Sequence, residues 1–371
     1  MVNIITGKTA NELVYNCLEQ IITKGNRTPS RNGDISTIYN AFCSIENPRA
    51  RHVCLDGRKN NIFASIAEMF WVFAGDDKID PLLSFFLPRA KDFSDDGITW
   101  RGAYGPRLFG ANEALDDLIQ QFKNEGIFTR RGVMSIFNPD LDTQKNLEIK
   151  YGLEKTKDRP CNLLMDFFVT PDKRVHMNLK QRSGDVLWGF GSVNLQVFTT
   201  LHEVVLNLLK SQVDSELTLG EYNHHVTNLH LYDFSGQQGY DVLENKLKQK
   251  LGVQNFQKIY VPNTPKEFIN FNKSICEVLT YGIENKITDY SSLVSKMGFV
   301  FGDYGNGKDL AFEENLYWKY AQVCCAYICA KNLNLEKGEV TDKISFDMSG
   351  CDEEFKMSIR NSSFRKFEIK E

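Results

Sequence analysis

Residues 159–194 restrict the possible folds of this chain more than any other segment. Two runs of strand-forming residues, 163–170 and 174–182, flank a Pro-Asp-Lys turn, which predicts an antiparallel pair of strands. Apolar and polar residues alternate along the second run, so one of its faces should be buried. The apolar set consists of Val175, Met177 and Leu179. The sequence therefore predicts a sheet with one covered face.

The pair Pro160-Cys161 opens this hairpin. A cysteine acts as a nucleophile through its thiolate, and a guanidinium brought alongside lowers the pKa of the thiol. Arg182 stands at the end of the second predicted strand, where it can lie next to the cysteine. A lone cysteine is more often a small buried hydrophobic residue. With Arg182 as its neighbour, the sulfur of Cys161 is our predicted reactive atom.

Residues 61–74 predict a helix that is apolar on nearly all sides. Glu68 lies in its middle, with Trp71 and Val72 as its i+3 and i+4 neighbours. A carboxyl group in such surroundings should be buried and should have a raised pKa. Such a group can shuttle protons, although a helix glutamate paired with a lysine would be purely structural.

The residue composition changes after about residue 240, where Lys- and Asn-rich helical segments follow one another. We expect residues 1–240 to form a catalytic domain and residues 241–371 to form a mainly helical C-terminal extension.

The composition limits the partners of the chain. The formal net charge is −4, which gives no general attraction to nucleic acid or to an anionic membrane, so no direct DNA binding is expected. Any phosphate must therefore be bound by a local group of arginines. The nine cysteines include no Cys-x-x-Cys pair, so no metal site is expected. The thiol content and the lack of a long apolar stretch predict a cytoplasmic protein.

Several short motifs occur in an order that resembles the thymidylate synthase and pyrimidine hydroxymethylase superfamily. The resemblance covers roughly residues 10–235 and implies an α+β fold, in which a large mixed or antiparallel sheet is covered by helices. The motifs are Glu68 within Ala-Glu-Met-Phe-Trp, Tyr104-Gly105, Arg130-Arg131, Pro160-Cys161, the Gln-Arg-Ser-x-Asp run of residues 181–185, and His230-Leu231-Tyr232.

The resemblance implies a phosphate site that two subunits share. Arg182 and Ser183 would bind the phosphate together with one loop arginine, for which Arg31 matches the family pattern better than Arg27. The adjacent pair Arg130-Arg131 would reach the phosphate bound in the other subunit. This sharing implies a homodimer.

The resemblance also implies how the nucleoside is bound. His230 and Tyr232 would contact the sugar, and Asn194 would bind the base through its carboxamide, which suits uracil, whereas an aspartate there would suit cytosine. Asn194 stands one residue later than the family spacing from Arg182. An insertion or bulge within residues 189–192 is therefore expected.

The remaining roles concern the one-carbon donor, which the resemblance implies to be 5,10-methylenetetrahydrofolate. Asp185 resembles the aspartate that binds the pterin ring. Glu68 and Tyr104 resemble the pair that handles protons near C5 of the base. Cys161 would add to C6 of the pyrimidine, after which C5 attacks the methylene group of the folate.

Two products are open at this point, because hydride transfer gives a methyl group and water gives a hydroxymethyl group. Three departures from the methylating members point to a wetter site. They are Asn162 after the nucleophile, a segment 85–92 without tryptophan, and a charged end at 367–371. We therefore predict 5-hydroxymethyl-deoxyuridylate as the product, which would suit a phage that makes modified DNA bases.

Other functions remain as alternatives. A thymidylate synthase that makes deoxythymidylate and a deoxycytidylate hydroxymethylase differ only in product or base. A catalytically inactive homologue that binds nucleotide or RNA is of a different class, but a pure binder needs no nucleophile. A cysteine hydrolase lacks a suitably placed histidine, because alternation turns His176 away from the buried face.

Overall fold

A computed structural model describes residues 2–110, 113–245, 257–304, 315–336 and 339–370. The first helix, α1 (Ala10–Lys24), shows why the local sequence folds as it does. The Thr9 side chain accepts a hydrogen bond from the Glu12 N–H at its start, and the Gly25 N–H donates to the Ile21 carbonyl at its end.

The centre of the fold is a mixed seven-stranded sheet with the order β1-β3-β7-β6-β5-β4 and β2 paired to β3. The pairs β1/β3 and β6/β7 are parallel, and the others are antiparallel. The strands are β1 (Asn3–Gly7), β2 (Asn26–Thr28), β3 (Ile35–Ile45), β4 (Val133–Ser135), β5 (Asn162–Val169), β6 (Arg174–Asp185) and β7 (Thr218–Tyr232).

The predicted hairpin is confirmed in β5 and β6, which pair antiparallel with Phe167 opposite Met177. The inward row Val175, Met177 and Leu179 is buried, as the alternation required. β4 is only three residues long and pairs with β5.

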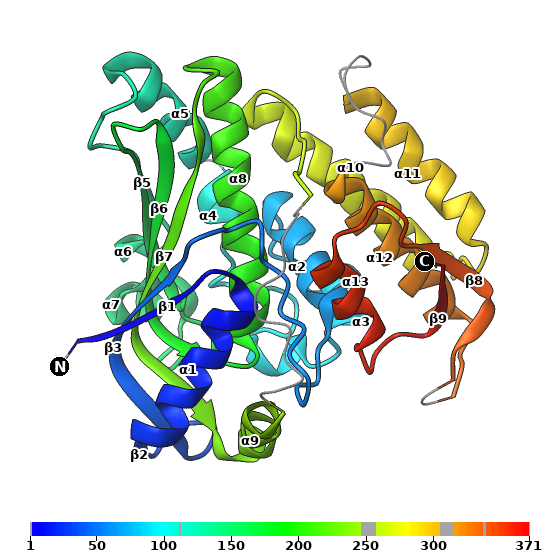
Figure 1. The fold of residues 1–371 in the computed structure, drawn as a ribbon, viewed down its shortest axis with the longest axis horizontal. Coiled ribbons are helices and arrows are strands. Elements are labelled where there is room, and N and C mark those ends of the chain that lie inside the picture. Colours follow the sequence, from blue (N-terminus) through cyan, green and yellow to red (C-terminus); the bar gives the residue numbers. More distant parts are fainter. Residues whose placement is uncertain (1, 111–112, 246–256, 305–314, 337–338, 371) are drawn as a thin grey trace.

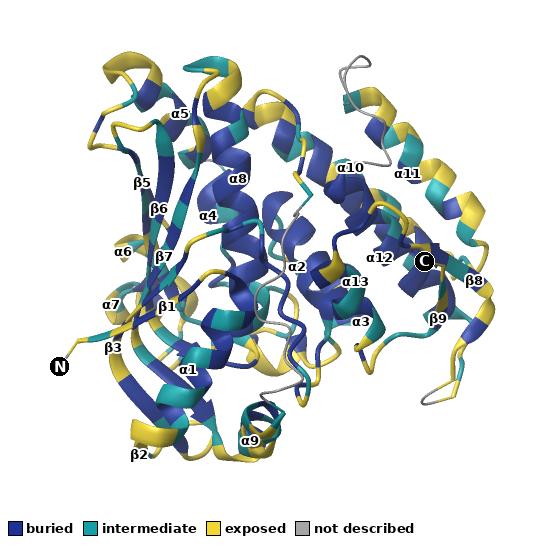
Figure 2. Ribbon diagram, viewed as in Figure 1, coloured by how far each residue is buried: buried dark blue, intermediate teal, exposed yellow. Residues whose placement is uncertain are grey.

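Helices α1 and α8 cover one face of the sheet, and α2 packs behind α8 (Figure 1). Figure 2 shows that α8 and α2 are buried along most of their length. Helices of this part of the chain are α2 (Ile62–Phe73), α3 (Leu82–Phe86), α4 (Gly105–Phe109), α5 (Ala114–Glu125), α6 (Pro139–Asp142), α7 (Gln144–Tyr151), α8 (Leu195–Gln212) and α9 (Gly236–Glu244).

The C-terminal part packs on the far side of α2, through α10 and α12 (Figure 1). Aromatic pairs make this contact, such as Phe70 with Tyr317 and Phe63 with Tyr327. Besides helices it contains a parallel strand pair, β8 with β9, which the helical pattern did not predict. Its elements are α10 (Pro265–Glu284), α11 (Tyr290–Tyr304), α12 (Leu316–Asn332), β8 (Thr341–Asp347), α13 (Glu353–Arg360) and β9 (Phe367–Lys370).

None of the helices formed by the described residues combines the length and apolarity needed to cross a membrane. Within the same residues, no group of three or more His, Cys, Asp or Glu side chains is arranged to hold a metal ion.

Candidate active site

Cys161 stands directly before β5, and the end of β6 brings Arg182 beside it. The Arg182 backbone N–H donates to the Cys161 carbonyl (2.9 Å), and the guanidinium lies 3.5 Å from the Cys161 sulfur. The same guanidinium donates to the carbonyls of Pro160 (2.9 Å) and Arg159 (2.8 Å), which fixes its position. Cys161 is half-buried, whereas the other eight cysteines are buried. The predicted pair is therefore formed, and Cys161 is the least buried of the nine cysteine residues.

The pKa of Cys161 differs from our expectation. Burial raises it, the Arg182 charge lowers it, the Asp158 carboxyl raises it, and the net shift is upward. The expectation of a lowered pKa is therefore wrong for the protein alone, because loss of hydration outweighs one guanidinium. The thiol must pass its proton to a base as it attacks.

The loop before Cys161 carries a carboxyl group that the motifs did not point to. Asp158 accepts a hydrogen bond from the Gly102 N–H (2.9 Å), and burial raises its pKa to about 6. A side chain at Gly102 would collide with this carboxylate, since a Cβ there would lie 2.5 Å from Oδ1. Asp158 is therefore a built feature of the site, and the only signal in the sequence was its place three residues before the nucleophile.

The structure distinguishes the two loop arginines. Arg31 donates to the carbonyls of Thr156 (3.4 Å) and Lys157 (3.3 Å), and its charge lowers the pKa of Cys161. Arg27 is exposed and forms an ion pair with Asp233 instead. Arg31 thus lies at the nucleophile and Arg27 does not.

Glu68 and Tyr104 approach the nucleophile from two different elements, α2 and the turn before α4. Burial raises the pKa of Glu68 to about 8, as the sequence predicted, although the side chain is half-buried rather than buried. Burial also raises the pKa of Tyr104, with smaller contributions from Cys161 and Glu68. Tyr104 therefore lies within electrostatic reach of both Cys161 and Glu68.

Asn194 reaches its position through an unusual turn. Residues Gly189–Asn194 form a π-helical turn that leads into α8, and Asn194 is buried. A π turn accommodates one extra residue in a helix and is frequent at functional sites. The π turn lies in the segment where the sequence predicted a one-residue insertion or bulge.

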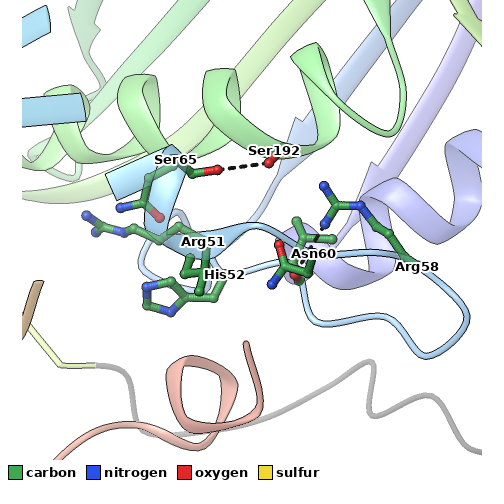
Figure 3. Close-up of a pocket in the computed structure, with 9 residues that line it drawn as sticks. Arg51, His52, Arg58, Asn60, Ser65 and Ser192 are labelled. Atoms are coloured by element: carbon green, nitrogen blue, oxygen red, sulfur yellow. Dashed lines mark hydrogen bonds between the residues drawn. The ribbon is translucent and has the colours of Figure 1, made fainter. Parts of the chain in front are cut away.

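A hydroxyl pair ties the Asn194 turn to the helix of Glu68. The Ser65 and Ser192 hydroxyls are 2.9 Å apart, and Figure 3 shows them facing each other. Ser65 and Ser192 also line a cavity of about 10 Å³, together with Arg51, His52, Arg58 and Asn60. A cavity of this size has room for one water and no larger ligand.

Asp185 lies near Arg58, one of the residues that line this cavity. Its Oδ1 accepts backbone hydrogen bonds from Leu187 (2.7 Å) and Trp188 (3.1 Å). Burial raises its pKa to about 6, while these bonds and the charge of Arg58 oppose the rise. The Arg58 guanidinium donates to the Leu187 carbonyl (2.6 Å), so it is held beside the carboxyl group.

His230 and Tyr232 share one face of β7, as predicted, with ring centroids 4.9 Å apart. The Nδ1 of His230 lies 3.0 Å from the Asn228 side-chain oxygen, and the Asn32 amide donates to the Tyr232 hydroxyl (3.5 Å). Asp185 pairs with His230 across the parallel β6–β7 ladder, and Ser183 pairs with Asn228. The ladder therefore gathers these groups at one end of the sheet.

Arg130 and Arg131 lie away from the nucleophile of their own chain. Both are exposed, and Arg131 pairs with Glu125 (2.9 Å). They precede β4, whose first residue pairs with Asp166 of β5. Cys161 stands at the other end of β5, so the arginine pair is roughly 20 Å away along the strand.

A thiol beside a guanidinium, next to a carboxyl with a raised pKa and within a mixed sheet, is suited to covalent catalysis on a small anionic substrate. The chain belongs to the thymidylate synthase family, because the family profile described as thymidylate synthase matches residues 14–292 of 371. The profile extends beyond the region that the motifs covered and into the C-terminal part.

Two phage proteins are similar over much of the chain. A deoxyuridylate hydroxymethyltransferase of Delftia phage PhiW-14 is 32% identical over 381 residues, which cover 99% of this chain and 98% of that protein. A deoxyuridylate hydroxymethyltransferase of Bacillus phage SP01 is 28% identical over 277 residues, covering 70% of this chain and 68% of that protein.

A solved structure supports the fold. The thermostable thymidylate synthase A from Bacillus subtilis matches with a TM-score of 0.50 and 18% identity, covering 70% of this chain and 91% of that chain. At this identity the likeness concerns the fold alone. The predicted α+β class, a mixed sheet covered by helices, is confirmed.

Proposed function

We propose that the protein transfers a hydroxymethyl group to C5 of deoxyuridylate. The observation that carries this proposal is the Cys161–Arg182 contact of 3.5 Å at the end of the sheet, in a chain similar over nearly its whole length to a deoxyuridylate hydroxymethyltransferase. A pure binding protein would need neither the accessible thiol nor the Glu68 carboxyl group.

The substrate phosphate fits the positive charges around the nucleophile. We assign Arg31, Arg182 and Ser183 to the phosphate, because guanidinium groups bind a dianionic phosphate through paired N–H donors. The Arg182 guanidinium lies 3.5 Å from the Cys161 sulfur, and the charge of Arg31 also acts on this thiol, which supports this assignment. His230 and Tyr232 would bind the sugar, and Asn194 the uracil edge.

The donor would be 5,10-methylenetetrahydrofolate, which supplies the one-carbon unit when bound. Asp185 fits the amino-substituted pterin ring. Its Oδ1 accepts both hydrogen bonds from the backbone N–H groups, and the carboxyl group is held beside Arg58. A carboxylate is the natural partner of such a ring, because it accepts from two neighbouring N–H groups. We therefore assign the Asp185 carboxyl group to recognition of the pterin ring.

The chain's own residues then perform the proton and covalent steps. The Cys161 sulfur adds to C6 of the base, and Asp158 is the nearby carboxylate able to take the thiol proton. Glu68, with its pKa of about 8, stabilises the charge that develops at O4 by donating its proton toward that oxygen, which leaves the carboxylate. The Tyr104 hydroxyl lies within reach of both groups and can relay the C5 proton, accepting it as it passes its own proton to water.

The proposed assembly is a homodimer that acts in the cytoplasm without binding DNA directly. The uncovered face of the sheet carries exposed apolar side chains, and Ile4 and Phe42 are register partners there. Two such faces packed together would remove this apolar surface from water. They would also allow Arg130 and Arg131 to serve a phosphate in the other subunit, since they lie far from their own Cys161.

Release of the C5 proton tests the function. With tritium at C5 of deoxyuridylate and methylene-folate present, the protein should release tritium, and Cys161→Ala should reduce release to background. Cys329→Ala, a buried cysteine of α12, serves as the control and should keep release near the wild-type level. Tritium release by Cys161→Ala at the wild-type rate would contradict the proposed nucleophile.

The product and the base distinguish the remaining alternatives. The mass of the product should exceed that of deoxythymidylate by one oxygen, and in ¹⁸O water that oxygen should be labelled. A thymidylate synthase would give the methyl product, and a deoxycytidylate hydroxymethylase would prefer the cytosine nucleotide. Nucleotide binding without any turnover would favour the inactive homologue.

A further inference from the structure

Two carboxamides interrupt the buried face of the sheet next to the nucleophile. The inward row of β6 runs through Val175, Met177 and Leu179 and ends at Gln181, which is 1% exposed. Asn162 is its register partner on β5 and is 0% exposed. A bulge between Asn162 and Leu164 turns the Asn162 side chain inward, directly after Cys161. Two amide groups therefore stand where the pattern of the sheet calls for apolar side chains.

Three polar atoms of these two amides make no hydrogen bond with any residue that the structure describes. Among the described residues, neither Oδ1 nor Nδ2 of Asn162 makes a hydrogen bond, and Oε1 of Gln181 makes none. Buried polar atoms are nearly always paired, and a cluster of unpaired ones points to a guest that can both donate and accept. One water molecule satisfies this requirement, because it offers two donors and two acceptors.

The neighbours of the cluster are the proposed proton-handling groups. Asn162 lowers the pKa of Tyr104, so the two side chains are close, although their contact does not meet the geometry of a hydrogen bond. Tyr104 is in turn influenced by Glu68 and Cys161. A water molecule held by the carboxamides would thus lie close to the groups that we propose to handle protons.

We propose that Asn162 and Gln181 hold the water that becomes the hydroxyl group of the product. This inference rests on the proposed function and deepens it, since it assigns residues to the second half of the reaction. The carboxamides position the water, and they are positioning residues because they donate no atom to the product.

The hydroxyl group forms by addition of this water to the base, followed by release of Cys161. After the folate departs, the base carries an exocyclic methylene at C5 and the Cys161 sulfur at C6. The water oxygen bonds to the methylene carbon, one water proton passes to the Glu68 carboxylate, and the electron pair of the methylene double bond moves toward the C4 carbonyl. Collapse of this enolate forms the C5–C6 double bond and breaks the C6–S bond, which releases the thiolate.

Gly184 makes room for this arrangement. A Cβ at Gly184 would lie 2.8 Å from the Gln181 Oε1 and 3.2 Å from the Phe190 Cβ. Any side chain there would displace the carboxamide of Gln181. Gly184→Ala therefore perturbs the same water site while both carboxamide residues stay in the chain.

The experiment separates the two halves of the reaction in single turnovers with enzyme in excess. Tritium release from C5 reports the first half, and 5-hydroxymethyl-deoxyuridylate reports the second. For Asn162→Leu and Gly184→Ala we expect tritium release within about threefold of wild type, and at least about tenfold less hydroxymethyl product for each tritium released. The missing product should appear as a covalent adduct on Cys161 by intact mass, or as methylated nucleotide.

The control is Asn146→Leu, which removes a carboxamide of α7 that donates to the Pro139 carbonyl (2.9 Å) and should leave the ratio unchanged. An unchanged ratio in both test variants would overturn the inference, and so would a proportional loss of both halves, which would indicate a structural role. If the wild-type protein releases no tritium, the proposed function itself fails.

Discussion

Asp142 and Glu68 are two carboxyl groups that are largely removed from water, and their pKa values shift in opposite directions. Asp142 is buried and accepts from the guanidinium groups of Arg107 (2.5 Å) and Arg101 (2.9 Å). Burial raises its pKa, but hydrogen bonds from Arg107 and from the Asn138 N–H lower it more, so the net shift is downward. For Glu68, burial alone acts and raises the pKa to about 8.

In our proposal the same chemical group serves structure at Asp142 and chemistry at Glu68. A carboxylate enclosed by arginines is locked in its charged form and holds loops together. A carboxyl without a cation exchanges its proton near neutral pH, which a proton carrier must do. The presence or absence of a partner therefore separates structural from reactive groups in this fold.

Removing the Glu68 carboxyl should have the largest effect on activity. We expect Glu68→Gln to lower kcat about 10²- to 10⁴-fold, because a general acid or base contributes that much. The thermal midpoint should not fall below that of wild type, since no ion pair is broken. Steady-state kinetics together with a thermal melt test this, and a large loss of stability with activity intact would reverse the assignment of Glu68.

Removing the Asp142 carboxyl should do the opposite. Asp142→Ala leaves the buried guanidinium of Arg107 without its carboxylate partner, and we expect a loss of about 3–5 kcal/mol in the free energy of unfolding. Urea titration measures this loss. Activity per folded molecule should be retained at low temperature, so a variant that is stable but inactive would contradict the structural role.

The two loop arginines extend the comparison to cations. Arg31→Ala should raise KM for deoxyuridylate about 10- to 100-fold, the worth of a charge-assisted hydrogen bond. Arg27 is already paired with Asp233, so Arg27→Ala should change KM less than about threefold. Equal effects of the two substitutions would remove the distinction between a paired and an available arginine.

The pH dependence of stability should also change. The pKa of Glu68 rises from 4.5 to about 8 on folding, so the unfolded chain loses this proton first and stability falls as pH rises through that range. Glu68→Gln should remove this part of the fall. Urea titrations of both proteins at about pH 5 and about pH 8 should therefore show the variant gaining relative to wild type as pH rises. A constant difference between them would mean that Glu68 is already ionised in the folded protein.

Several parts of the site followed from short-range patterns. The hairpin of β5 and β6 brought Cys161 and Arg182 together because antiparallel pairing places the start of one strand beside the end of the next. The apolar surroundings of Glu68 predicted its raised pKa in the same way. The spacing of Asn194 indicated an extra residue, and the π turn accommodates it.

Other parts depended on contacts between distant segments. The net pKa of Cys161 reflects Asp158 and burial, and neither can be summed from a motif. The choice between Arg31 and Arg27 depends on which carbonyl and carboxyl groups lie within their reach. The unpaired amides of Asn162 and Gln181 become visible only when every neighbouring donor and acceptor is placed.

The sequence by itself determined the β5–β6 hairpin and the apolar helix of Glu68, and it pointed to Cys161 as the candidate nucleophile, because periodicity and turn residues act over a few positions. Only the tertiary structure decided which groups are paired, which are left without partners, and how the C-terminal helices pack against α2. The reason is physical: the free energy of a buried polar group depends on the atoms around it, and these come from segments far apart along the chain.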